Sequence, residues 1–113
     1  MLIRSEILRL KSLHTAKSRK SANTVLIEGL RLVEDCLLSQ WPIKSLFMTE
    51  DNMSRPKYIK AVNLAKSVAI KHVLVSKNDM ERISDTKNPQ GIAMEIYIPL
   101  KNKNISLENK VLY

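Results

Sequence analysis

The sequence predicts an α/β fold, in the form of a small three-layer α/β/α sandwich with a mainly parallel sheet. Short apolar runs alternate along the chain with segments in which apolar residues recur at helical spacing. Strands that alternate with helices favour parallel pairing, with helices on both faces of the sheet. The length of 113 residues suits one compact domain. The single cysteine, Cys36, excludes an internal disulfide.

The first half of the chain provides two helices and two strands. Residues 3–15 carry apolar side chains at helical spacing and form the first expected helix. The run VLI at 25–27 is a short buried strand that ends at Gly29. An amphipathic helix follows from residue 30 to about residue 40, and the segment IKSLFMT at 43–49 is the second strand.

The second half repeats the alternation. After a polar loop, Pro56 suits the first turn of a helix. Three further elements, a strand, a short helix and a fourth strand, follow in the segments 72–76, 77–84 and 91–98. Ser76 or Asn78 is expected to cap the short helix. Residues 1–99 are therefore interpreted as one domain, and the Lys- and Asn-rich residues 100–113 as a linker and the first strand of a further domain.

The charge balance indicates an acidic partner. The net charge is +8, and the first 20 residues hold six Lys/Arg residues against one acid, Glu6. Nucleic acid is the commonest acidic partner of a basic domain, although a generally Lys-rich composition would give the same balance. Charged residues interrupt the apolar residues at the N-terminus, so we expect no signal peptide. No apolar stretch is long enough to span a membrane. We therefore expect a cytoplasmic protein with no membrane partner.

The sequence lacks the motifs for metal binding and for phosphate binding by a glycine-rich loop. His14, His72 and Cys36 lack the spacing of metal ligands, so Cys36 is expected to be a small buried hydrophobe. The chain has only two glycines, too few for a glycine-rich phosphate loop. We therefore expect no catalytic residue, metal or cofactor within these residues.

Two segments remain as candidate sites. In SRKSANTVLIEGLRLVEDCL (residues 18–37), the strand ends at Glu28 and Gly29, and Arg31 opens the following helix. Helix N-termini favour anions, because their N–H groups are unpaired and the dipole is positive there. Alternatively, Glu28 caps the helix or pairs locally with Arg31, and Gly29 only permits a tight turn.

The second segment is SDTKNPQGIAM (residues 84–94). A type I turn accounts for Asn88, Pro89 and Gly91, since Asn, Pro and Gly suit its first, second and fourth positions. The turn does not account for Gln90, whose amide offers both a donor and an acceptor. Gln90 could bind nucleic acid, brace the neighbouring loop or face another domain.

Together, the two motifs resemble the N-terminal substrate-binding domain of the TrmH/SpoU-type RNA 2′-O-ribose methyltransferases, over essentially the whole chain. The resemblance rests on an Arg followed nine residues later by Glu-Gly and then Arg, and on Pro-Gln-Gly before the last strand. Those residues are here Arg19, Glu28, Gly29, Arg31, Pro89, Gln90 and Gly91. Asn23 and Val25 depart from the Gly and the aromatic residue usual in the family, but Asn also tolerates a left-handed turn.

This resemblance implies a fold like that of the ribosomal proteins that bind kinked RNA. It also implies a further domain that binds S-adenosylmethionine, carries the catalytic residues, transfers a methyl group to a ribose 2′-hydroxyl and forms a homodimer. The present domain would capture RNA, with ribosomal RNA as the expected class. This chain alone is not expected to methylate RNA.

The resulting hypothesis is an RNA-binding domain whose cations contact phosphates. The expected contacts are Arg19, Lys20 and Arg31, extended by Lys17 and Arg9. Two alternatives stay open: a stand-alone kinked-RNA-binding protein, and a docking or dimerisation module organised by Glu28 and Gln90.

Overall fold

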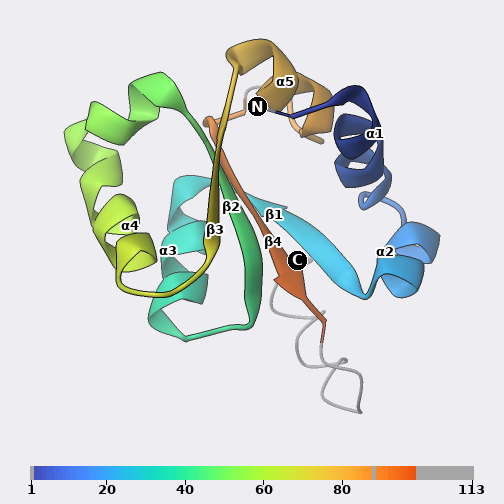
Figure 1. Ribbon diagram of the computed structural model, residues 1–113, viewed down its shortest axis with the longest axis horizontal. Helices are drawn as coiled ribbons and strands as arrows, with labels where there is room; N and C mark the ends of the chain where they lie inside the picture. Colours follow the sequence, from blue (N-terminus) through green and yellow to red (C-terminus); the bar gives the residue numbers. More distant parts are fainter. Residues whose placement is uncertain (1, 88, 99–113) are drawn as a thin grey trace.

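The protein folds around one four-stranded sheet with helices on both faces (Figure 1). The computed structural model describes residues 2–87 and 89–98. The strand order is β1–β4–β2–β3, with β1 at Thr24–Glu28, β2 at Ile43–Thr49, β3 at Lys71–Val75 and β4 at Ile92–Tyr97. The predicted α/β class is confirmed, and all four predicted strands are present.

The prediction of a mainly parallel sheet is wrong. Only β2 and β3 pair in parallel, because β4 inserts between β1 and β2 and pairs antiparallel with both. The helix before β4, α5 (Lys77–Ile83), has 7 residues and a length of only about 10 Å. Such a helix cannot return the chain along a strand of about 20 Å. Strand β4 therefore begins at the end of the sheet at which β3 finishes, and it runs in the opposite direction (Figure 1).

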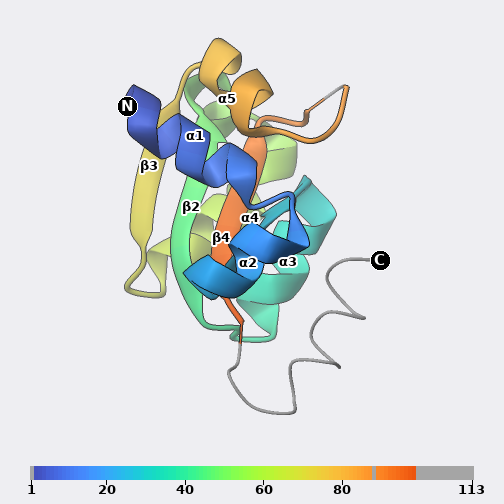
Figure 2. The same ribbon diagram turned by 90° about the vertical axis from the view of Figure 1, so that its right-hand side faces the viewer.

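The helices form two layers with separate apolar cores. Helices α3 (Leu30–Leu38) and α4 (Pro56–Lys66) pack on one face, where Val33 and Ala61 meet strand residues such as Met94. Helix α1 (Arg4–Ser12) and α5 cover the other face, as Figure 2 shows, around Leu10 and Phe47. The 3-10 helix η1 (Glu50–Ser54) joins β2 to α4.

The predicted helix over residues 3–15 is present but shorter, and the helix that follows it was not predicted. Helix α1 ends at Ser12, and a second helix, α2 (Ala16–Ala22), begins after Thr15. The Thr15 hydroxyl accepts a hydrogen bond from the Ser18 amide at 3.2 Å, which is a typical N-cap. Asn23 ends α2 in the left-handed conformation (φ 61°), as expected for this residue.

Other local predictions are confirmed. Pro56 is the first residue of α4, and the Ser76 hydroxyl caps α5 by accepting from the Asp79 amide. Cys36 is buried, and burial raises the pKa of its thiol to about 11. Asn88 and the predicted linker at 100–113 lie outside the described residues. In the described part of the chain, no helix has the length and apolar character that crossing a membrane requires.

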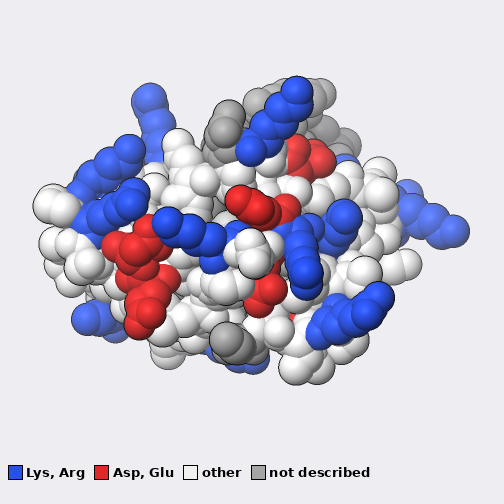
Figure 3. Space-filling view, turned by 90° about the horizontal axis from the view of Figure 1, so that it is seen from above, with Lys and Arg blue, Asp and Glu red and all other residues white. Residues whose placement is uncertain are grey.

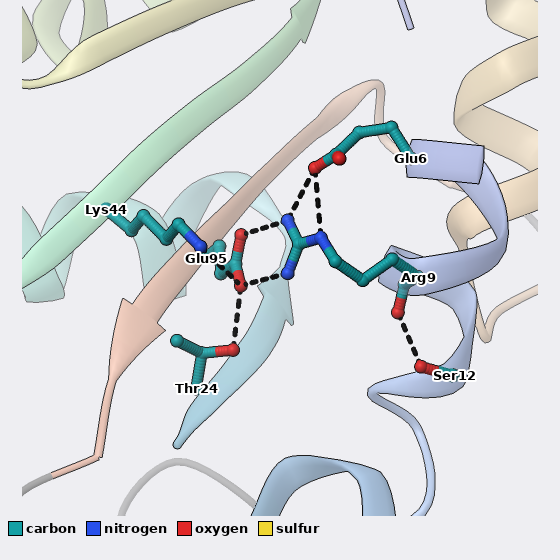
Figure 4. Close-up of polar contacts among 6 residues, drawn as sticks. All are labelled: Glu6, Arg9, Ser12, Thr24, Lys44 and Glu95. Carbon is teal, nitrogen blue, oxygen red and sulfur yellow. Dashed lines mark hydrogen bonds and ion pairs between the residues drawn. The ribbon is translucent and has the colours of Figure 1, made fainter. Parts of the chain in front are cut away.

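A fully buried carboxylate connects α1 to the sheet (Figure 4). Glu95 lies on β4 and accepts two hydrogen bonds from the Arg9 guanidinium, at 2.7 and 2.8 Å, and one from the Thr24 hydroxyl at 2.7 Å. Lys44 lies 3.9 Å from the same carboxylate, and Glu6 binds the outer side of Arg9. Burial raises the pKa of Glu95, but the hydrogen bonds from Arg9 and Thr24 outweigh burial and leave the pKa below its ordinary value.

Arg9→Ala is expected to lower the free energy of unfolding by about 3 kcal/mol, because it leaves a buried carboxylate without its main partner. Arg4→Ala on the same helix is the control, since Arg4 is exposed, and should change the free energy by less than about 0.5 kcal/mol. Urea unfolding of both variants measures the difference. Equal losses would contradict a structural role for the Arg9–Glu95 pair.

Candidate functional site

The two sequence motifs meet at one edge of the sheet. Strands β1, β2 and β3 all run in one direction and β4 runs in the other. The carboxyl ends of the first three strands and the beginning of β4 therefore share an edge, which faces the viewer in Figure 3. Glu28 and Gly29 reach this edge at the end of β1, and Pro89, Gln90 and Gly91 reach it just before β4.

Gln90 braces the helix that follows the first motif. Its side-chain Oε1 accepts a hydrogen bond from the Leu30 amide, 60 residues earlier, at 2.7 Å. Leu30 is the first residue of α3, and the residue before it, Gly29, has no side chain with which to cap the helix. Gln90 therefore satisfies an amide that the local sequence leaves unpaired.

Glu28 binds in the opposite direction, from the first segment to the beginning of the second segment (residues 84–94). Its carboxylate accepts hydrogen bonds from the Ser84 hydroxyl and, at 2.9 Å, from the Asp85 amide. The alternative expected from the sequence, a local pair between Glu28 and Arg31, is not what the structure shows. The two motifs thus hold each other through reciprocal hydrogen bonds, which we call the motif clasp: Glu28 to Ser84 and Asp85, and Gln90 to Leu30.

The backbone of the second motif is fixed by residues that the sequence did not single out. The Asn52 amide donates to the carbonyls of Gln90 and Gly91 at 2.8 and 3.1 Å, and the Tyr58 hydroxyl also donates to the Gln90 carbonyl at 2.8 Å. Asn52 is buried, although it comes from a polar loop in the sequence. No short-range pattern marks it, because its partners lie 38 and 39 residues away.

A cavity of about 460 Å³ lies beside the motif clasp. Glu28, Gly29, Arg31, Thr86 and Gln90 line it. Arg31 is exposed and is the one predicted phosphate contact that the structure places at this edge. Leu32 and Asp35 also line it, so the cavity presents both polar groups and apolar surface.

The other predicted phosphate contacts lie elsewhere. Lys17 and Lys20 are exposed on α2, and Arg19 donates to the Leu13 carbonyl at 3.1 Å. Helix α2 precedes β1 and Arg31 follows it, so the strand, with a length of about 17 Å, separates the two groups. Arg9 binds Glu6 and Glu95. The five cations predicted from the sequence therefore do not form one cluster, and their contact with RNA stays a prediction.

Gln90→Ala is expected to lower the free energy of unfolding by about 1 kcal/mol, because the Leu30 amide loses its acceptor. The Leu30 amide should also exchange faster with solvent. Gln90→Glu is the matched control, since a carboxylate keeps the acceptor and suits a helix N-terminus. Hydrogen exchange followed by NMR measures both effects, and unchanged protection of Leu30 in Gln90→Ala would contradict the brace.

The two glycines are expected to differ in their tolerance of a side chain. Both have positive φ, +100° for Gly29 and +77° for Gly91. A Cβ at Gly91 would lie 2.4 Å from Asn52 Nδ2 and 2.7 Å from Thr49 Oγ1, whereas the nearest atom to a Cβ at Gly29 is 3.5 Å away. Gly29→Ala should cost about 1–3 kcal/mol of backbone strain. Gly91→Ala should cost more in thermal unfolding, and an equal cost would contradict the predicted overlap.

Comparison with known proteins places this geometry in a family. The model of the MRM3-like substrate binding domain matches residues 4–94. The chain is 30% identical over 102 residues to the 23S rRNA (guanosine(2553)-2′-O)-methyltransferase RlmP of Bacillus subtilis, a match that covers 90% of this chain and 37% of that protein.

Solved structures show the same fold. The SpoU methyltransferase AviRb from Streptomyces viridochromogenes, solved with the cofactor AdoMet, matches with a TM-score of 0.73 at 15% identity, over 88% of this chain and 37% of that one. An rRNA methyltransferase from Sinorhizobium meliloti matches with a TM-score of 0.68 at 21% identity, over 89% and 36%. The chain thus spans little more than a third of each relative. The resemblance that the two motifs indicated is confirmed: this chain belongs to the MRM3-like substrate binding domain family.

Proposed function

We propose that this chain is the RNA-binding domain of an RNA 2′-O-ribose methyltransferase, and that it captures the substrate for a catalytic domain outside these residues. The family match and the name of the Bacillus subtilis relative support this proposal. The fact that the chain spans 37% of that relative supports the view that methyl transfer requires more than this domain.

The observation that carries the proposal is helix α2. None of its 7 residues is buried, so the helix adds nothing to either apolar core. Its caps, Thr15 and Asn23, hold it in place, and it presents Lys17 and Lys20 to solvent. A helix that is ordered without an apolar face and carries exposed cations suits a phosphate backbone, since phosphate contacts require charge and position but no pocket.

The exposed cations of the adjoining helix extend this surface. Arg4 and Lys11 are both exposed on α1. We assign Arg9 to positioning α1, because its guanidinium already binds two carboxylates. Arg31 would contact the RNA separately, at the edge that holds the motif clasp.

The RNA-binding role is preferred to a docking module. Glu28 and Gln90, which would organise docking, use their carboxylate and amide oxygens within the domain. For the whole protein, the proposal includes ribosomal RNA as substrate, S-adenosylmethionine as the cofactor of the catalytic domain, a homodimer and a cytoplasmic location.

Lys17→Ala/Lys20→Ala is expected to weaken binding of a fluorescein-labelled single-stranded RNA and to reduce its salt dependence. Loss of two phosphate contacts should flatten the plot of log affinity against log salt by about 1.4 units, at roughly 0.7 per contact. Fluorescence anisotropy over a series of salt concentrations measures both.

The control is Lys57→Ala/Lys60→Ala, which removes the same charge from exposed positions of α4, in the opposite helix layer. If the α2 variant and this control have equal slopes, the effect comes from net charge alone, and the assignment of the RNA surface to α2 is wrong.

A further inference from the structure

The sheet contains a point where successive helices diverge to opposite faces. Strands β2 and β3 are adjacent and parallel. Helix α4, which follows β2, packs with α3 on one face, whereas α5, which follows β3, packs with α1 on the other. In open α/β sheets, ligands bind in the crevice outside the carboxyl ends of such strands. The topology therefore singles out one position on the sheet edge, independently of the sequence motifs.

A cavity of about 260 Å³ occupies that position. Asp51 and Arg55 approach it from the β2–α4 connection, Lys77 and Glu81 from α5, and Gln90 from the second motif. Met80 also lines the cavity, although its side chain is almost completely buried in the core. The volume is below the roughly 300–1,000 Å³ of pockets for drug-sized ligands, so it suits a single planar group such as one base.

The cavity has two cations, Arg55 and Lys77, beside the carboxylate of Asp51, and a second carboxylate, Glu81. Arg55 and Lys77 both approach the same oxygen of Asp51, at 3.1 and 3.7 Å, and their side chains remain 57% and 76% exposed. Glu81 is exposed and forms no ion pair in the described part of the chain. A hydrogen bond with Thr49 keeps the pKa of Asp51 below its ordinary value, so this carboxylate stays charged at neutral pH.

A ligand that matches these charges has N–H donors for the Glu81 carboxylate and an anion for the cations. A nucleotide has both, because its base edge carries donors and its phosphate is negative. Guanine presents two adjacent donors, N1–H and the N2 amino group, which one carboxylate can accept together. Unstacked bases are commonly read along this edge in single-stranded RNA.

We propose that the crevice between the ends of β2 and β3 binds one guanine nucleotide of the RNA. Glu81 accepts from the base edge, and Arg55 and Lys77 contact the phosphate. This assignment deepens the proposed RNA-binding function and rests on it. It adds a site that recognises a base to the α2 surface, which contacts only the backbone.

The test is an NMR titration of the 113-residue chain with millimolar guanosine 5′-monophosphate. The expected result is a set of amide shifts at Asn52, Glu81 and Gly91, with inosine 5′-monophosphate, which lacks the N2 amino group, binding about fivefold or more weakly. Uridine 5′-monophosphate, with one N–H donor on its base, should also bind more weakly.

Glu81→Gln should weaken guanosine monophosphate about tenfold, whereas Glu34→Gln on α3, outside the cavity, should leave the affinity unchanged. Equal shifts with inorganic phosphate would overturn the proposal, since they would assign the effect to the cations alone. Shifts at another surface, no shifts, or equal affinity for the inosine nucleotide would also overturn it. These outcomes are independent of the salt dependence at α2, so the crevice can fail while the RNA-binding function stands.

Discussion

Strand β4 enters the sheet antiparallel between β1 and β2, and this placement organises the whole domain. It brings the beginning of the last strand to the edge where the three other strands end. Gly91 makes this entry possible, because its positive φ and lack of a Cβ allow the backbone to approach Asn52 and Thr49. The meeting of the two motifs, and both cavities beside them, follow from this single placement.

The motif residues first serve the domain itself. Gln90 caps α3, and Glu28 holds the segment at Ser84 and Asp85, so the loops at this edge are fixed by hydrogen bonds that join distant parts of the chain. A site on loops needs such support if its geometry is to be maintained. The side chains left to face the cavities are then the ones available to a ligand, notably Arg31 on one side of Gln90 and Glu81 on the other.

The basic N-terminal segment divides into two physical roles. Arg9 donates two hydrogen bonds to Glu95, because a buried carboxylate on a central strand requires a partner. Lys17 and Lys20 of α2 remain exposed at the surface. One charged segment therefore both attaches α1 to the sheet and presents positive charge for a polyanion, and the proposed backbone contacts lie apart from the proposed base-recognition site.

The sequence was enough to predict the α/β class, the positions of the four strands and the starts of α4 and α5, and it singled out Glu28 and Gln90. These depend on periodicity, on Pro and Ser at helix starts and on short motifs, which act over a few residues. The direction of β4, the role of Arg9 and the participation of Asn52 become visible in the folded domain alone. Their partners lie tens of residues away, and a local sequence pattern does not indicate which distant group a residue will contact. The sequence likewise placed Arg19, Lys20 and Arg31 close together along the chain, but a strand between them moves them to opposite ends of the sheet.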